Sequence, residues 1–368
     1  MTLSTNQPFN PNRDPRKNIE INIGKSCNNR CVFCLDGLPK KEDRSYIDFD
    51  FMQAELQRWY TEGHRSVGFL GGEPTTYPKI VESVQFAKNL GYTRIAIATN
   101  ATKLRLAHFT DKLLDAGLTR VTISMHGHTA SLEDKLTRVP GNFLKKCQAI
   151  LYLQEKRKQG FLPDGLSINI VLNGWNYKYL PKMLQFFYEK MGIVDIRVNY
   201  IRPEGYAEGN KDLTPRFTEV VPYLVKAILL NEYHFKKTFT FGGIPMCMLP
   251  PQIRNSEEIL RKYMGEYRDL STNCSIRGES MTEVEAMYGE QLHDTNDHHA
   301  QRYQAQQVQD GVSVVENGRA RFNWQDRKRF DLKAHPPVCN TCTQYHVCEG
   351  VWDGYLQIWD STELHPIQ

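Results

Sequence analysis

The chain has 368 residues, of which 40% are hydrophobic, and its 46 Lys and Arg against 42 Asp and Glu leave a formal net charge of +4. This length predicts about two domains with a sizeable core, and it excludes a disordered chain, a collagen-like chain or a small disulfide-stabilised scaffold. Because the charge is nearly balanced and no Lys/Arg-rich block stands out, we do not expect nucleic acid as the main partner.

The sequence shows no targeting signal and no membrane span. Residues 1–10 are polar, and no run approaches the roughly 18 apolar residues of a transmembrane helix. We therefore expect a cytoplasmic protein with no membrane partner. In a reducing compartment, the nine cysteines indicate metal or redox chemistry before disulfides.

From residue 18 to about residue 202, short β-branched runs alternate with longer amphipathic segments. The six expected strands are residues 19–23, 67–70, 94–99, 120–125, 166–172 and 195–201. The expected helices are residues 51–62, 78–90, 104–116, 143–158 and 179–191. Four of these helices are followed by a glycine, the residue that best adopts the left-handed backbone of a helix end: Gly63, Gly91, Gly117 and Gly192.

This alternation predicts an α/β fold with a parallel sheet, because each helix supplies the crossover between parallel strands. Six βα units are too few for a closed eight-stranded barrel, so we expect an open partial barrel or a flat doubly wound sheet. In both folds, ligands bind at the carboxyl ends of the strands. After residue 202 the repeat stops, and a helix at residues 217–232 leads into a region rich in Cys, Pro and Gly. We expect an amino-terminal extension (1–18), a βα core (19–215) and a smaller carboxy-terminal domain (216–368).

Residues 285–310 are dominated by Gln, His, Asp and Asn and have little periodicity. We interpret them as a solvated loop or insertion. A His/Asp metal site is the alternative, since imidazole and carboxylate suit divalent metals, but the spacing matches no closed metal site.

Three cysteines follow the first expected strand with C-x3-C-x2-C spacing: Cys27, Cys31 and Cys34. Three thiolates this close together can bind one metal centre, whereas they cannot all pair as disulfides. Zinc would need a fourth ligand, usually from a second closely spaced pair. A four-iron cluster with three thiolate ligands instead keeps one iron open to bind and reduce a substrate.

This loop resembles the signature of the radical S-adenosylmethionine (SAM) superfamily, with an aromatic residue, Phe33, before the third cysteine. The resemblance implies a [4Fe-4S] cluster whose open iron chelates the amino and carboxylate groups of SAM. Electron transfer then cleaves SAM to methionine and a 5'-deoxyadenosyl radical. It further implies a reductant such as flavodoxin or ferredoxin, a place for Phe33 near adenine, and a core folded as a partial (βα)6 TIM barrel.

A second motif, Gly71-Gly72-Glu73-Pro74, ends the second expected strand. Two glycines let the backbone approach a ligand closely, and Glu73 offers a carboxylate to an ammonium group. The motif is similar to the GGEP motif of the same superfamily, which contacts the SAM amino group. An ordinary turn is the alternative interpretation.

Weaker resemblances at later strand ends imply further SAM contacts. In related enzymes a serine at the fourth strand and a basic residue after it commonly bind the SAM carboxylate and ribose, and Ser124 and Arg138 match these places. Asn100 after the third strand, and Asn169 or Asn173 at the fifth, are further candidates. Each is also compatible with a turn residue or a helix cap.

Other polar residues are candidates by position alone. His126 and His128 follow the fourth strand and could serve as acid–base groups. Asn199, Arg202 and Glu204 lie at the end of the sixth strand, where a barrel of this kind reacts. The alternative for Arg202 and Glu204 is a salt bridge at the rim.

The carboxy-terminal region carries a C-x2-C-x5-C run, followed two residues later by a glycine: Cys339, Cys342 and Cys348. The run resembles the SPASM/twitch extension of radical SAM enzymes, which holds one or two auxiliary clusters, although Trp352 stands where the full pattern has another cysteine. Five thiols cannot fill two four-thiolate sites, so we expect one auxiliary [4Fe-4S] cluster. Cys247 is the favoured fourth ligand because it follows a turn-like segment, and Cys274 is the alternative.

Zinc is the competing metal for the carboxy-terminal site. The ninth cysteine, Cys147, is expected in the core.

These motifs together predict a radical SAM enzyme that abstracts a hydrogen atom from a substrate enclosed between SAM and the auxiliary cluster. They leave open a ribosomal peptide or protein, or a small metabolite, as the substrate. Peptide maturases often carry an amino-terminal leader-binding domain, and the first strand begins near residue 19, which weakens the peptide interpretation. A non-catalytic iron–sulfur or zinc protein is the alternative function.

Overall fold

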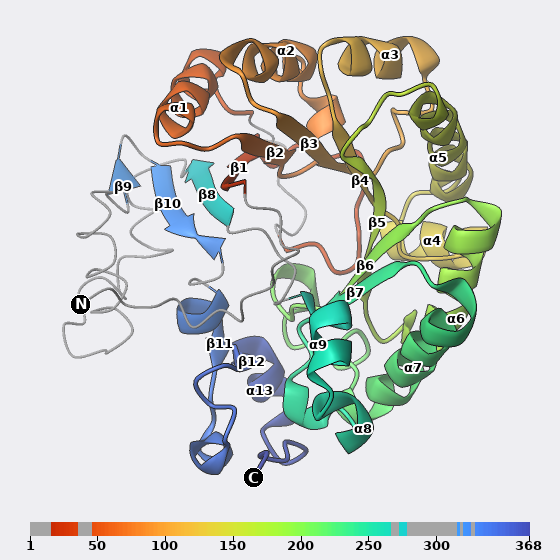
Figure 1. Cartoon of the computed structure of the whole chain (residues 1–368), viewed down its shortest axis with the longest axis vertical. Coiled ribbons are helices and arrows are strands. Elements are labelled where there is room, and N and C mark those ends of the chain that lie inside the picture. The colour runs from red at the N-terminus through yellow and green to blue at the C-terminus, as the bar shows by residue number, and fades with distance from the viewer. Residues whose placement is uncertain (1–15, 36–45, 266–271, 278–314, 317–318, 325–327) are drawn as a thin grey trace.

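The computed structural model describes residues 16–35, 46–265, 272–277, 315–316, 319–324 and 328–368. Within these residues, a curved sheet has ten strands in the order β7-β6-β5-β4-β3-β2-β1-β8-β10-β9 (Figure 1). Its parallel strands are β1 (Asn18–Asn22), β2 (Ser66–Leu70), β3 (Arg94–Thr99), β4 (Arg120–Ser124), β5 (Gly165–Leu172), β6 (Asp195–Tyr200), β7 (Thr238–Gly242) and β8 (Thr272–Arg277). Antiparallel β10 (Arg319–Asn323) and β9 (Val315–Glu316) complete one edge.

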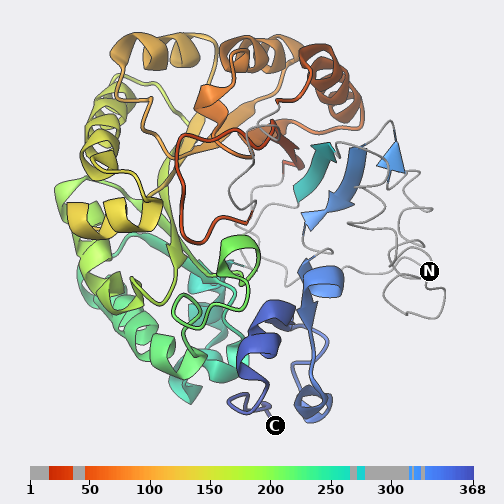
Figure 2. The same cartoon turned by 180° about the vertical axis from the view of Figure 1, so that it is seen from behind.

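Helices connect β1 through β7 as crossovers and cover the outer side of the arc in both views (Figures 1 and 2). They are α1 (Phe49–Thr61), α2 (Ile80–Leu90), α3 (Ala107–Asp115), α4 (Ala130–Thr137), α5 (Asn142–Lys158), α6 (Leu180–Gln185) and α7 (Phe217–Leu230). The expected partial barrel of βα units is therefore confirmed. Among the described helices, each is too short or too polar to cross a lipid bilayer.

The two faces of the sheet differ as the strand alternation requires. Ile19 and Ile21 on β1 are fully buried against the helices, whereas Glu20 between them is partly exposed on the concave face. The same alternation recurs on β4, β5 and β6. Ala98, on β3 in the middle of the sheet, is exposed. The concave face of the barrel is thus open to solvent at Ala98.

The expected strands match the observed ones to within a residue or two, and the four glycines after helices all have positive φ, from 66° to 109°. Sequence analysis did not find α4, β7 or β8–β10. Because β7 pairs with β6, the sheet continues past residue 215, where the second domain was expected to begin. Residues 285–310 lie outside the described residues.

The carboxy-terminal segment packs on the β6 side of the barrel. It contains β11 (Lys333–Ala334), β12 (Val351–Trp352) and α13 (Asp353–Trp359), and it follows α8 (Pro251–Arg254) and α9 (Glu257–Tyr263) along the chain. Tyr355 stacks on Phe217 with ring centroids 4.1 Å apart. Glu363 accepts hydrogen bonds from the backbone N–H groups of Phe217 and Thr218, at 3.2 and 3.1 Å, and so caps α7. These contacts hold the carboxy-terminal cysteines at the mouth of the barrel.

Candidate active site

The loop with Cys27, Cys31 and Cys34 lies at the carboxyl end of β1 and is tied to the end of α4. The N–H of Arg30 donates to the carbonyl of Thr137 at 3.0 Å, and the N–H of Val32 donates to the carbonyl of Leu136 at 2.9 Å. The last carbonyls of a helix have no partner within the helix, so they are available to bind this loop. Asn142, at the start of α5, adds a side-chain bond to Asn29 at 2.7 Å.

The three thiols lie close enough to influence one another electrostatically. Burial is the main cause that raises the pKa of Cys27 to about 11 and that of Cys31 to about 12, and the neighbouring thiols of the set raise both further. An iron cluster would offset this cost because it binds thiolates. The N–H of Asn29 also donates to Cys27 Sγ at 3.3 Å, a bond that favours the thiolate. The donor set therefore fits a cluster.

Two negative findings accompany this set. The cysteines form no disulfide in the described residues. In that part of the chain, no three His, Cys, Asp or Glu side chains converge on a single-ion site. A four-iron cluster has no such requirement, because each thiolate binds a different iron.

Glu73 is buried, and its carboxylate joins the ends of β2 and β3. Oε1 accepts bonds from the N–H and hydroxyl of Thr75, at 3.0 and 2.6 Å, and from the hydroxyl of Thr99. Oε2 accepts the N–H of Asn100 at 2.6 Å. These donors hold the carboxylate in one orientation at the carboxyl ends of the strands. Sequence reasoning missed the two threonines, since only the fold brings Thr99 to Glu73.

The glycines of this motif are required by close contacts within the chain. A Cβ on Gly71 would lie 2.0 Å from Oδ1 of Asn22, and one on Gly72 would lie 2.3 Å from the carbonyl oxygen of Ser26. Both glycines also have positive φ. Pro74 then begins a buried 3₁₀ turn, Pro74–Thr76. The motif is thus packed directly against the end of β1 and the start of the cysteine loop.

Gly71→Ala is expected to destabilise the protein by about 3 kcal/mol, from left-handed backbone strain plus the overlap with Asn22. Gly63→Ala is the matched control, because Gly63 has nearly the same φ, 91° against 90°, but nothing within 4 Å of the added Cβ. The control should lose only the roughly 1–2 kcal/mol of backbone strain. Urea unfolding measures both values, and equal losses would contradict the close-packing argument.

Asn100 is fastened to the cysteine loop. Its Nδ2 donates to Oδ1 of Asn28 at 2.7 Å, and its Oδ1 accepts the N–H of Thr102 at 3.0 Å. A side-chain hydrogen bond from Asn100 also lowers the pKa of Cys27, against the larger effect of burial. Asn100 therefore orients the loop that carries the thiols.

Phe33 belongs to the same loop, and Ser124 and Arg138 are the other two expected SAM contacts beside it. Ser124 ends β4 and is partly exposed, and Phe33 is buried edge-on against the ring of His126, with centroids 4.6 Å apart. Arg138 is exposed and has its guanidinium 5.5 Å above the ring of Tyr206. The N–H of Tyr206 donates to the carbonyl of Cys34 at 3.1 Å. All three expected SAM contacts thus lie at the carboxyl end of the sheet.

The side chains of Asn173 and His126 form hydrogen bonds with the backbone of this protein. The side chain of Asn173 accepts the N–H of Trp175 at 3.0 Å and donates to the carbonyl of Val171 at 3.1 Å, which organises the turn after β5. His126 Nδ1 accepts the N–H of Val171 at 3.0 Å, and burial holds the pKa of His126 well below its usual range. His126 is therefore neutral, which argues against an acid–base role.

The remaining polar candidates lie on β5 and β6 or follow the strand ends. Asn169 Oδ1 accepts a bond from Nδ2 of Asn199 at 2.7 Å, so these side chains lie together on β5 and β6. Arg202 forms an ion pair with Glu204, which agrees with the alternative interpretation of these two residues as a salt bridge at the rim. His128 is partly buried, and this burial lowers its pKa, with the charge of Lys182 as a second cause.

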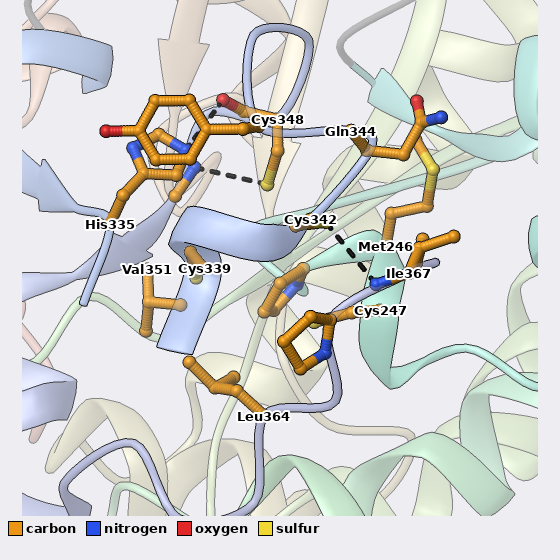
Figure 3. A pocket seen from close by; sticks show the side chains of 14 residues that line it. Met246, Cys247, His335, Cys339, Cys342, Gln344, Cys348, Val351, Leu364 and Ile367 are labelled. Atoms are coloured by element: carbon orange, nitrogen blue, oxygen red, sulfur yellow. Dashed lines mark hydrogen bonds between the residues drawn. The ribbon is translucent and has the colours of Figure 1, made fainter. Parts of the chain in front are cut away.

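Four further cysteines line one pocket, seen in Figure 3: Cys247, Cys339, Cys342 and Cys348. Burial and the three neighbouring thiols raise the pKa of Cys247 to about 12. The N–H of Gly350 donates to Cys348 Sγ at 3.3 Å, and the N–H of Ile367 donates to Cys342 Sγ at 3.4 Å. The cavity thus combines four thiols with backbone donors that favour thiolates.

The remaining cysteines lie elsewhere. Cys274 is on β8, with its Cα paired to Glu20 of β1 in the barrel sheet. Cys147 packs against the core from α5, as expected. Trp352, which replaces the further cysteine of the SPASM pattern, is buried, and its ring lies 5.6 Å from the guanidinium of Arg202.

Residues 21–187 match the family model of the Radical SAM superfamily. This chain carries a radical SAM domain. It is accordingly an enzyme that uses SAM and a [4Fe-4S] cluster, and the non-catalytic alternative is not supported.

Relatives and solved structures agree with this assignment. The chain is 27% identical to a probable GTP 3',8-cyclase of Metallosphaera sedula, over 64% of this chain and 73% of that protein. It is 31% identical to a GTP 3',8-cyclase of Listeria monocytogenes, over 51% of this chain and 55% of that protein. The crystal structure of Streptococcus suis SuiB bound to S-adenosylmethionine has a TM-score of 0.59 at 17% identity, over 92% of this chain and 73% of that chain. The last likeness concerns the fold alone.

Proposed function

We propose that this radical SAM enzyme abstracts a hydrogen atom from a small metabolite bound on the concave face of the sheet. The observation that supports this proposal is the exposed Ala98 on a central strand, beside a concave face that is polar at Asn169 and Asn199. When bound, the cluster and SAM supply the 5'-deoxyadenosyl radical. The barrel holds the substrate at the strand ends, where that radical is formed.

The residues of the first site have distinct proposed roles. Cys27, Cys31 and Cys34 are the cluster ligands, and Glu73 faces the SAM ammonium group. The motif Gly71–Pro74 and Phe33, Ser124 and Arg138 border the nucleoside and carboxylate of SAM. Asn100 and Asn173 act as positioning residues, because their side chains already hold the backbone of the cysteine loop and of the β5 turn. A one-electron reductant such as flavodoxin or ferredoxin is the proposed protein partner.

The carboxy-terminal cavity is the proposed site of one auxiliary [4Fe-4S] cluster, as in a SPASM/twitch-like domain. Cys247 is the proposed fourth ligand, since it lines the cavity with Cys339, Cys342 and Cys348. Four thiolates leave no iron open, so this site would shape the substrate pocket, or the cluster held there would supply an acceptor for an electron from a product radical. Zinc in place of iron would be the contrary result on metal analysis.

Two buried hydrogen-bond donors near the mouth of the barrel indicate that the substrate carries hydrogen-bond acceptors. Nε of Arg202 and Nε1 of Trp352 have no hydrogen-bond acceptor among the described residues. A buried donor without a partner costs about 1–3 kcal/mol, so an acceptor from the substrate would stabilise both. Carbonyl, carboxylate or phosphate oxygens fit this requirement. The names of the relatives support a nucleotide as the first substrate to test.

The experiment is anaerobic reconstitution with iron and sulfide, reduction, and assay of 5'-deoxyadenosine from SAM. About eight irons are expected, at four per cluster. Addition of GTP should increase 5'-deoxyadenosine formation if the substrate is a nucleotide of this kind, and deuterium transfer from labelled substrate would identify the abstracted hydrogen. Failure to cleave SAM in the reduced protein would contradict the proposed function, whereas stimulation by peptides alone would contradict the small-metabolite class.

Cys342→Ala is expected to retain formation of 5'-deoxyadenosine from SAM while losing the product of the true substrate. The physical reason is that Cys342 belongs to the second cavity and not to the loop that binds the first cluster. Iron content should fall by up to about four atoms per chain. The control is Cys147→Ala, because Cys147 packs against the core from α5. This variant should retain both 5'-deoxyadenosine formation and product formation. Native product formation by the Cys342 variant would show that the second site is dispensable.

A further inference from the structure

A fully buried ion pair lies beneath the cysteine loop. Lys146 on α5 and Glu133 on α4 are 1% and 0% exposed in their side chains, and Nζ lies 2.5 Å from Oε1. Both groups have additional partners: Nζ donates to the carbonyl of Ser124 at 2.7 Å, and Oε2 accepts the N–H of His126 at 2.7 Å. Burying two charges is costly, and a pair of apolar residues at such positions often makes the folded protein equally stable. Stability alone therefore does not explain this ion pair.

The surroundings place this pair against the cluster loop. Glu133 is on α4, whose last carbonyls bind the N–H groups of Arg30 and Val32, the two neighbours of Cys31. His126, bonded to Glu133, packs its ring on Phe33 of the same loop. The ion pair therefore lies between the end of β4 and the segment that contains Cys31.

Both charges of the pair are shielded from solvent beside this loop, since the side chains of Lys146 and Glu133 are 1% and 0% exposed. Because water is excluded here, neither charge is screened as a surface charge would be.

We propose that the Lys146–Glu133 pair sets the reduction potential of the cluster bound by this loop, because both buried charges lie against the segment that contains Cys31. Reduction adds one negative charge to the cluster, and a nearby buried cation stabilises the reduced form. The Glu133 carboxylate opposes this effect and holds the ammonium group of Lys146 in place. The inference rests on the proposed ligation by Cys27, Cys31 and Cys34.

The test is a redox titration of the reconstituted full-length protein, followed by electron paramagnetic resonance. The amino-terminal cluster is recognised as the one whose signal changes on addition of SAM. Lys146→Met should lower its potential, because the cation is lost. Glu133→Gln should raise it, because the anion is lost. The Lys146→Met/Glu133→Gln double variant should lie between the two single variants.

A purely structural role would not move the potential in opposite directions, so the sign pattern is the decisive readout. Lys156→Met is the matched control, because Lys156 is on the same helix but pairs with Asp111 at the surface and should leave the potential unchanged. If one single variant fails to bind iron, the other and the double variant still report a direction. Equal potentials in all variants that bind iron, or shifts of the same sign in both single variants, would overturn the inference. Absence of any SAM-responsive cluster in the native protein would instead contradict the proposed ligation.

Discussion

Replacing Cys27, Cys31 and Cys34 together by alanine is expected to abolish 5'-deoxyadenosine formation and to remove about four of about eight irons. The three thiols lie in one loop that the α4 carbonyls hold in place, so no other described cysteine can substitute for them. The auxiliary cysteines lie in a different cavity, in the segment packed on the β6 side of the barrel, and should keep their iron.

Iron analysis and the absorbance of the reconstituted protein measure this result. The control is Cys147→Ala, which removes a thiol from α5 and should change neither iron content nor SAM cleavage. Unchanged iron in the triple variant would show that the amino-terminal loop is not a cluster site.

Glu73→Gln is expected to weaken SAM binding roughly 10–100-fold, the equivalent of about 1.5–3 kcal/mol for a charge-assisted hydrogen bond. The substitution keeps the size of the side chain but removes the charge that would face the SAM ammonium. It also places an amide near donors from Thr75, Thr99 and Asn100, so a lower melting temperature should accompany the loss. Cluster iron should remain, since Glu73 is not a proposed ligand.

Equilibrium binding of SAM to the reconstituted, unreduced protein separates affinity from turnover. Glu82→Gln is the control, because Glu82 is exposed on α2 and pairs only with Lys79 at the surface. Native SAM affinity in the Glu73 variant, together with a lowered melting temperature, would assign Glu73 a structural role only.

Much of the barrel was predictable from the sequence because its strands are short apolar runs with one buried face, such as residues 19–23 and 166–172, ended by polar turns. The cysteine spacing and the GGEP motif were equally visible, because both are local and follow a strand directly. By contrast, β8 and β10 pair across a long sequence separation, and α4 is too short for a clear helical pattern. Local periodicity carries no information about such pairings.

The amino-acid sequence alone was enough to establish the fold class, the three-cysteine loop and the C-x2-C-x5-C run, because these depend on residue type and spacing within short segments. It could not establish that Cys247 joins the three carboxy-terminal cysteines, that Glu73 binds Thr99, or that Lys146 and Glu133 form a buried pair. Each of these contacts joins different elements of the chain. They exist because the curved sheet and its packed helices bring separate strand and helix ends to one edge. Burial at this edge strengthens the interactions of charges and hydrogen bonds.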